Sequence, residues 1–181
     1  MQNIPKEKII FILLLLIIGI FYRFMPHPPN FSPLAAIALF GGFYFSRMRF
    51  ALIPIAILFL TDIVLGFYQI EIMLSVYTSF ILITLLGVQI KKKTSFYTII
   101  GGSLLGSILF FLITNFSVWL FGNWYAHDFS GLINCFYLAL PFFRNTLLGD
   151  LFFTAVFFGI YEFSQIYILK KRAKLSRPIA L

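Results

Sequence analysis

The sequence predicts an all-α fold, a bundle of about six transmembrane helices with both chain termini on the cytoplasmic side. The first observation is composition: 61% of the 181 residues are hydrophobic and only 11% are charged, whereas apolar residues make up about half of a soluble domain. The second is that several apolar runs reach or approach the roughly 20 residues that cross a bilayer. The third is the placement of the positive charges. We therefore treat residues 1–181 as a single integral membrane domain.

Long apolar runs bounded by charges, Pro and Gly predict six spans in chain order. The first run follows Lys6 and Lys8 and has no small-residue cleavage site after it, so we interpret it as a retained helix and not a signal peptide. The second span is short. The predicted spans are 9–24, 33–45, 50–67, 72–90, 96–121 and 145–169.

The segment between the last two spans is long and apolar in its middle. The stretch "LINCFYLALPFF" is too short to span and contains Pro141 near its end. We expect a separate interfacial or re-entrant helix here, ahead of the last span.

Positive charges fall almost entirely on one side of this six-span arrangement. Only Arg23 and Arg144, of the 14 Lys and Arg residues, fall on the other side. Positive residues mark the cytoplasmic face, so we expect a multi-pass protein of the bacterial inner (plasma) membrane with both termini inside. The bias also explains the net charge of +8 without a nucleic-acid partner; the partner of these charges is the lipid bilayer. The twelve residues on the cytoplasmic side are Lys6, Lys8, Arg47, Arg49, Lys91, Lys92, Lys93, Lys170, Lys171, Arg172, Lys174 and Arg177.

Polar residues inside the spans gather at one depth, near the outer face. Asp62 lies about 18 Å along the third span, since a helix rises about 1.5 Å per residue. The same arithmetic places Arg23, Asn115 and Asp150 in that layer, although the four residues come from four different spans. Side chains just above it are His27, Asn30, Trp119, Trp124, Tyr125, His127, Asp128, Arg144 and Asn145.

Two interpretations of this layer stay open. Arg23 or Arg144 pairs with Asp62 or Asp150 and pins helices together, below an ordinary aromatic belt. Alternatively the layer lines a cavity open to the outside, which we favour because ionisable groups inside a membrane are costly and mark solute pathways. In the inner half, Glu162 is expected to lean toward Lys170.

The first outer loop lies in "RFMPHPPNFSPLAAIALFGG", residues 23–42. Proline removes an N–H donor and clashes with the preceding helical turn, so this stretch cannot remain helical. Its stiffness favours a wall of a binding site that presents His27 and Asn30, with Asn115 and Trp119 facing them, to a flat ligand with polar edges. A rigid cap that only closes the bundle is the equally weighted alternative.

Small residues indicate surfaces of close helix contact. They line the second span from Ala35 to Gly42, and Gly102 and Gly106 on the fifth have small-xxx-small spacing. We expect contacts within the bundle, with docking to a partner membrane protein as the alternative.

Enzyme signals are weak. The sequence has no Ser/His/Asp order, HExxH, CxxC or P-loop pattern. His27, His127 and Cys135 match no recognised metal spacing, and the roles of Cys135 and His127 stay open. We expect no enzymatic activity, no cofactor and no metal. A proton-coupled secondary transporter is an alternative, although no chain of acidic residues crosses the membrane.

The six spans and the stretch "FSPLAAIALFGGFYFSRMRFALIPIAILFLTDIVLG" resemble the substrate-binding S components of energy-coupling factor transporters. The segments "PHPPNFSPLAAIALFGG" and "PFFRNTLLGDLFFT" also look like a related group of uncharacterised bacterial six-helix membrane proteins. The resemblance implies capture of a vitamin-like, aromatic or heterocyclic micronutrient beneath the first loop. It also implies docking to a transmembrane coupling protein with ATPase subunits, often through an Ala-xxx-Ala pattern on the first helix. Here that helix, "IIFILLLLIIGIFY", contains no alanine.

The combined expectation is a substrate-capture or transport subunit, with a structural or assembly protein that binds no small ligand as the alternative. The expected substrate-binding residues are His27, Asn30, Asp62, Asn115, Trp119, Asp150, Arg144 and Asn145.

Overall fold

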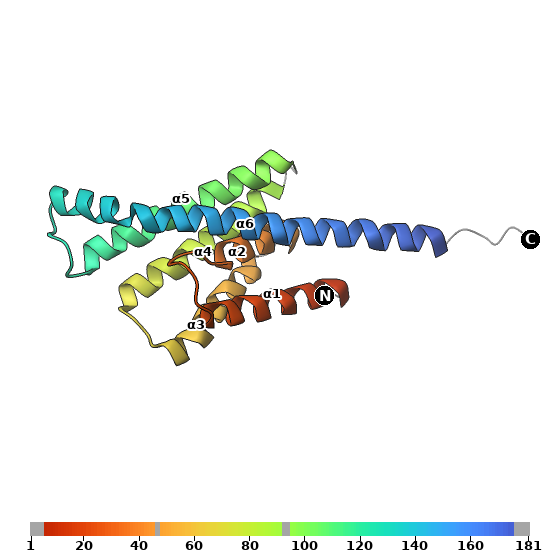
Figure 1. The fold of residues 1–181 in the computed structure, drawn as a ribbon, viewed down its shortest axis with the longest axis horizontal. Helices are drawn as coiled ribbons and strands as arrows, with labels where there is room; N and C mark the ends of the chain where they lie inside the picture. The colour runs from red at the N-terminus through yellow and green to blue at the C-terminus, as the bar shows by residue number, and fades with distance from the viewer. Residues whose placement is uncertain (1–5, 46–47, 92–94, 176–181) are drawn as a thin grey trace, which may run out of the picture.

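The computed structural model describes residues 6–45, 48–91 and 95–175, and within these ranges the chain forms six α-helices and one short 3-10 helix (Figure 1). The all-α fold class is confirmed. The bounds are α1 (Lys6–Phe24), α2 (Leu34–Phe45), η1 (Met48–Ala51), α3 (Leu52–Leu65), α4 (Ile70–Ile90), α5 (Phe96–Phe121) and α6 (Phe129–Leu175). The first five helices agree with the predicted spans to within a few residues.

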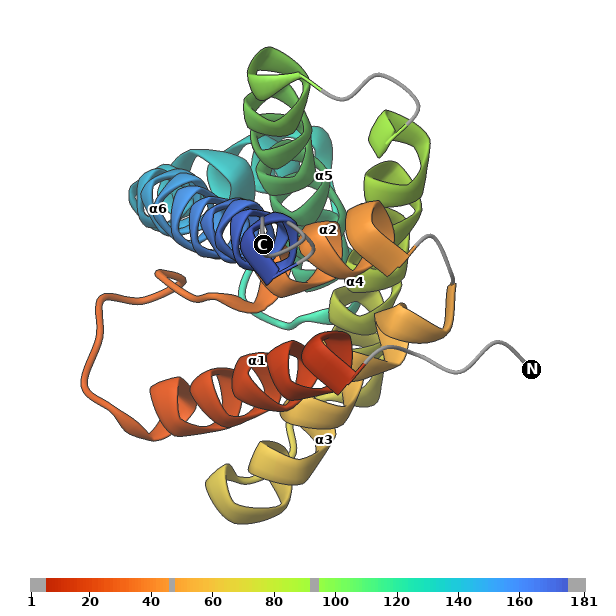
Figure 2. The same cartoon turned by 90° about the vertical axis from the view of Figure 1, so that its right-hand side faces the viewer.

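Helix α2 is the centre of the bundle. A helix that is apolar all round has no face suited to solvent, and its residues Leu34–Phe43 are buried. It contacts α3, α4, α5 and α6, and the end-on view of Figure 2 shows it surrounded by the other helices.

Glycines allow the backbones of α2 and α4 to touch. A Cβ atom added to Gly42 would overlap the carbonyl oxygen of Thr84, and one added to Gly87 would overlap the carbonyl oxygen of Leu39. The small residues of the second span therefore make contacts within the bundle, as expected. Because α2 is buried, its small-residue face is not available for docking to a partner.

The small residues of α5 also face inward. A Cβ atom added to Gly102 would lie 2.7 Å from Cδ1 of Ile90, and one at Gly106 would lie 3.5 Å from Cγ2 of Ile83. Both contacts are with α4, so this surface too belongs to the bundle.

Aromatic rings fill the core beside α2. The Phe40 ring lies 5.0 Å from that of Phe11 and 5.2 Å from that of Phe158. Nearby, the Tyr44 hydroxyl donates a hydrogen bond to Glu162, so this carboxylate is bound to α2. The expected partner, Lys170, has a side chain outside the described part of the chain.

Helix α6 is one continuous element of 47 residues, about 70 Å long at the usual rise. The expectation of a separate interfacial helix is wrong, because Pro141 lies inside α6. Proline removes a single backbone hydrogen bond, and in an apolar environment that loss costs less than opening a loop with several unpaired groups. The helix begins after Asp128, whose Oδ1 accepts a hydrogen bond of 2.7 Å from the Gly131 backbone N–H.

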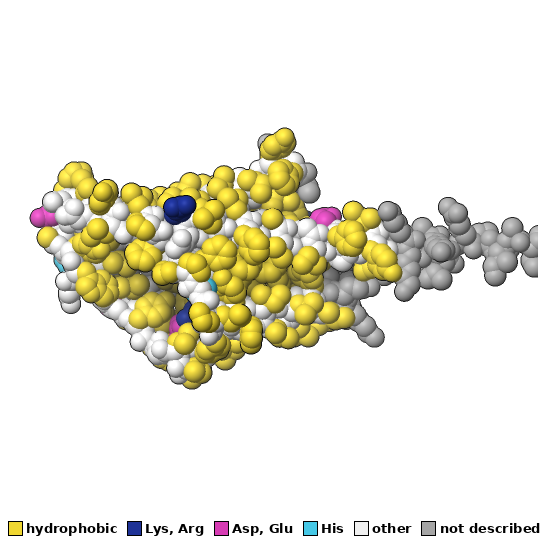
Figure 3. Space-filling model, in the orientation of Figure 1, with side chains coloured by type: hydrophobic (Ala, Val, Ile, Leu, Met, Phe, Trp, Pro, Cys, Tyr) yellow, Lys and Arg dark blue, Asp and Glu magenta, His cyan; other side chains and the backbone are white. Residues whose placement is uncertain are grey.

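In the part of the chain that the structure describes, three helices are long and apolar enough to cross a membrane: α4, α5 and the part of α6 from Phe129 to Ile168. The apolar helices Ile9–Phe24, Leu34–Phe45 and Leu52–Leu65 are shorter. The face of the molecule in Figure 3 is mostly hydrophobic, as lipid contact requires. These features indicate a membrane protein. Figure 1 also shows that α1 begins and α6 ends at the same end of the bundle, opposite the α5–α6 connection.

Candidate ligand-binding cavity

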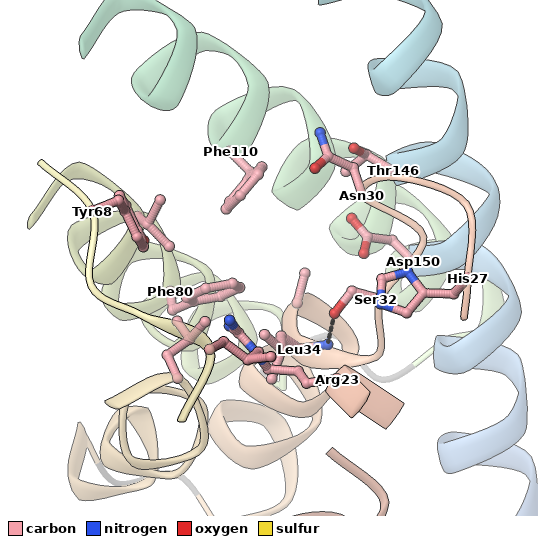
Figure 4. Close-up of a pocket in the computed structure, with 14 residues that line it drawn as sticks. Arg23, His27, Asn30, Ser32, Leu34, Tyr68, Phe80, Phe110, Thr146 and Asp150 are labelled. Carbon is pink, nitrogen blue, oxygen red and sulfur yellow. Dashed lines mark hydrogen bonds between the residues drawn. The ribbon is translucent and has the colours of Figure 1, made fainter. Parts of the chain in front are cut away.

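A cavity of about 290 Å³ lies where the bundle is capped by the first loop, residues 25–33. Residues of all six α-helices line it, together with two loops (Figure 4). Its polar lining consists of Arg23, His27, Asn30, Ser32, Tyr68, Thr146 and Asp150.

The first loop has a defined conformation. The Phe31 backbone N–H donates to the Pro28 carbonyl at 3.1 Å, which closes a turn. Asn30 within this turn has a φ of 63°, in the left-handed region that asparagine tolerates better than most residues. After the turn, Ser32 Oγ accepts a hydrogen bond of 3.4 Å from the Leu34 N–H at the start of α2. The loop therefore holds the Asn30 side chain at the cavity, as Figure 4 shows.

Helix α6 anchors this loop. Asn145 Nδ2 donates to the Pro29 carbonyl at 3.0 Å. One turn later, a Cβ atom at Gly149 would lie 3.1 Å from both Phe31 Cα and Ser32 N, so helix and loop backbones are in close contact. The loop is thus bound to the helix that also supplies Thr146 and Asp150.

Asp150 is the buried acid of the cavity, with 3% of its surface exposed. Ser107 on α5 donates a hydrogen bond of 2.6 Å to its Oδ2. The polar contacts between α5 and α6 continue with Thr154, which donates to Ser103 Oγ at 3.2 Å. Figure 4 shows the Asp150 carboxylate directed into the cavity.

Arg23 and Asp62 form an ion pair between the end of α1 and α3. The distance from the Arg23 guanidinium to Asp62 Oδ1 is 2.6 Å, and the side chains are 20% and 1% exposed respectively. Asp62 Oδ2 and the hydroxyl of Tyr77 are both buried and have no hydrogen-bond partner among the described residues. The pairing of an arginine with a buried acid, which was the less favoured of the two interpretations, is thus present, and Arg23 itself also lines the cavity.

Two further side chains line the cavity from loops. The pKa of Tyr68 is raised to about 12, chiefly by burial and then by the negative charge of Asp62, so its hydroxyl remains a hydrogen-bond donor. The His27 ring stacks on Tyr22 with 4.9 Å between centroids. Its Nδ1 lies 2.9 Å from the Pro28 carbonyl oxygen, and because a carbonyl can only accept, Nδ1 carries a hydrogen.

Comparison with protein families matches residues 3–173 to a family of unknown function, DUF6580. The chain belongs to this family. The comparisons with curated proteins and with solved structures found no match. Since the DUF6580 match extends over nearly the whole chain, every residue of the cavity lies inside it.

The structure of this DUF6580 member brings only some of the expected site residues together. His27, Asn30 and Asp150 line the cavity. Asp62 holds Arg23 at the cavity wall, and Asn145 contacts the first loop from outside the lining.

Three expected residues lie elsewhere. Asn115 donates to the Phe111 carbonyl of its own helix at 2.8 Å. Trp119 Nε1 donates to the Ala126 carbonyl at 3.0 Å, so it fastens the α5–α6 connection. Arg144 is exposed. The predicted depth in the membrane therefore placed in one site residues whose side chains point in different directions around the bundle.

Sequence reasoning also missed part of the lining. Thr146 lies one helical turn before Asp150, a spacing that places both on one face. The rings of Phe80 and Phe110, 5.5 Å apart, form an aromatic wall. No signal distinguishes these two among the 25 phenylalanines of the chain.

The described residues contain no group of three or more His, Cys, Asp or Glu side chains that could hold a metal ion. His127 Nε2 lies 3.2 Å from the Gly122 carbonyl oxygen. The buried Cys135 thiol donates to the Asn115 carbonyl at 3.4 Å. Both side chains therefore stabilise the region where α5 meets α6.

Proposed function

We propose that the protein is a membrane-embedded capture subunit for a small, vitamin-like micronutrient, and that the cavity beneath the first loop is its binding site. The observation that carries the proposal is a cavity with polar side chains on one wall and aromatic rings on the other, inside a bundle whose surface is largely apolar. Polar and ionisable groups within membrane helices are costly and tend to mark solute pathways.

The dimensions favour a small solute. A volume of about 290 Å³ corresponds to roughly ten water molecules and lies at the low end for small-molecule sites. The rings of Phe80 and Phe110 suit a flat aromatic or heterocyclic group, and the amide of Asn30 can read its polar edge.

The proposal includes six membrane-crossing helices with cytoplasmic termini and a cavity that opens outward in the bacterial inner membrane. The charge bias supports this topology. Helices α2 and α3 have 12 and 14 residues, about 18 and 21 Å, against a hydrocarbon core of about 30 Å. Such short helices leave the loops 25–33 and 66–69 below the outer surface. Non-helical backbone at that depth is tolerated where it lines a cavity.

In this proposal the chain catalyses no reaction and uses no cofactor. It captures solute alone or together with a transmembrane coupling protein and ATPase subunits. Copurification from the native membrane distinguishes these two arrangements.

The test is mass spectrometry of small molecules released from the purified protein. We expect one compound at near-stoichiometric amount, lost in Asp150→Ala and retained in the control Arg144→Ala, because Arg144 is exposed and outside the cavity lining. Release of no compound, with other membrane proteins copurifying instead, would refute capture and favour an assembly role.

A further inference from the structure

The charges around the cavity do not balance. Arg23 lines the cavity, but its guanidinium is compensated by Asp62 at 2.6 Å. Asp150 also lines it, and no described Lys, Arg or His side chain forms an ion pair with its carboxylate. A buried carboxylate without a cation is costly in a membrane interior. Asp150 is thus the ionisable group of the cavity lining that lacks an opposite charge beside it.

The geometry of Asp150 leaves one oxygen available. Its hydrogen bond from Ser107 goes to Oδ2, and Oδ1 accepts none from the described residues. The side chain is 97% buried, since 3% of its surface is exposed, and it points into the cavity from α6 (Figure 4).

Besides Asp150, three side chains of the lining offer acceptor atoms, alongside the donors of Arg23 and Tyr68. The Thr146 hydroxyl hydrogen is donated to the Phe142 carbonyl at 3.0 Å, so its oxygen can only accept from a ligand. The Nδ1 hydrogen of His27 is directed to the Pro28 carbonyl, and in the tautomer that carries only this hydrogen Nε2 is an acceptor. The Asn30 amide adds a carbonyl oxygen. Such a wall complements a group rich in N–H donors.

The opposite wall is aromatic. Phe80, Phe110 and Tyr68 line the cavity across from the first loop and α6 (Figure 4). Aromatic faces attract organic cations and pack against flat apolar groups. A bare inorganic ion would leave most of this volume empty.

We infer that the ligand is a small organic ammonium with an apolar or aromatic body, its N–H groups bound by Asp150, Thr146 and Asn30 and its body packed against Phe80 and Phe110. This inference rests on the proposed capture function and adds the charge of the solute.

The experiment uses three probes that share one ring and chain but differ in charge: 2-phenylethylamine, 2-phenylethanol and phenylacetate. Binding to the full-length protein in detergent is measured by calorimetry and by thermal stability, in a potassium buffer and again with sodium. We expect the amine to bind more tightly than the alcohol by at least about tenfold, the value of one charge-assisted hydrogen bond, and phenylacetate not to bind.

Two variants separate charge from structure. Asp150→Asn keeps the shape but removes the charge, so the amine should lose at least about tenfold in affinity while the alcohol is unchanged. Ser107→Ala removes the hydrogen bond to Oδ2 but keeps the carboxylate, so the preference for the amine should remain.

The outcomes distinguish the two proposals. Equal or tighter binding of the alcohol or phenylacetate, stabilisation by sodium alone, or an unchanged amine preference in Asp150→Asn overturns the ammonium inference. A neutral or anionic compound released from the purified protein overturns it too, while leaving capture intact. If the purified protein releases no compound and none of the probes binds, both proposals fail.

Discussion

The ion pair between Arg23 and Asp62 should show strongly unequal costs when its two halves are removed. The structure gives the reason, because the Asp62 side chain is 1% exposed whereas that of Arg23 is 20% exposed and borders the cavity. The perturbations are Arg23→Met, Asp62→Leu and the double variant, which replace each charge by an apolar side chain of similar size.

The magnitudes follow from what each change leaves behind. Arg23→Met leaves a buried carboxylate whose Oδ2 already has no partner among the described residues, so we expect a loss of about 3–5 kcal/mol in unfolding free energy. Asp62→Leu leaves a guanidinium that can reach water in the cavity, so we expect about 1–3 kcal/mol. The double variant leaves no unpaired charge and should cost less than Arg23→Met alone, as replacements of both partners often do.

The assay is reversible unfolding of the four proteins in mixed micelles, with Arg144→Met as a control at an exposed arginine that should change little. The cycle should give a coupling energy of at least about 2 kcal/mol, whereas independent sites add within about 0.5 kcal/mol. Additive costs, or a larger loss from Asp62→Leu than from Arg23→Met, would show that the pair is not held as the structure describes.

Three further pairs of substitutions test the packing, the loop and the topology. Gly42→Ala forces a Cβ atom onto the Thr84 carbonyl and should lower the unfolding free energy by about 1–3 kcal/mol, whereas Gly101→Ala, with open space around it, should stabilise α5 by up to about 1 kcal/mol; equal effects would contradict the α2–α4 contact. Asn30→Ala should cost about 1 kcal/mol because of its positive φ and Asn30→Gly much less, so similar melting temperatures would argue against this turn. A cysteine at Lys92 should be labelled only from the cytoplasmic side and one at His127 only from outside, and labelling of position 92 in intact cells would refute the proposed topology.

The ends of a helix could be predicted from the sequence where capping residues mark them. The bounds of α5 match the predicted span 96–121. Ser95 caps its start by accepting a hydrogen bond of 3.1 Å from the Thr98 N–H, and Gly122 follows its end. The prediction took Pro141 as the end of a helix and therefore missed that α6 is continuous through it. The cap residue Asp128, which precedes Phe129, is the local signal that marks the true start.

The sequence predicted the depth of the site residues in the membrane but not the directions of their side chains. Residue counting placed Arg23, Asp150 and Asn115 in one layer, and the structure brings the first two to one cavity while Asn115 bonds to its own helix. The reason is that a rise of about 1.5 Å per residue fixes height, whereas the direction of a side chain depends on how each helix is rotated against its neighbours.

Helix α6 both anchors the first loop and lines the cavity. Asn145 and Gly149 hold the loop backbone, and Thr146 and Asp150, each one residue further along, line the cavity. Because these positions repeat at the helical spacing of four residues, the anchor and the polar wall lie on one rigid element. The loop cannot move away from Asp150 without losing the Asn145 hydrogen bond and the Gly149 contact. The loop is therefore a cap of the bundle and a wall of the cavity at once. In the proposed capture function, the polar side of the cavity would be formed before a solute binds, which would lower the entropic cost of binding.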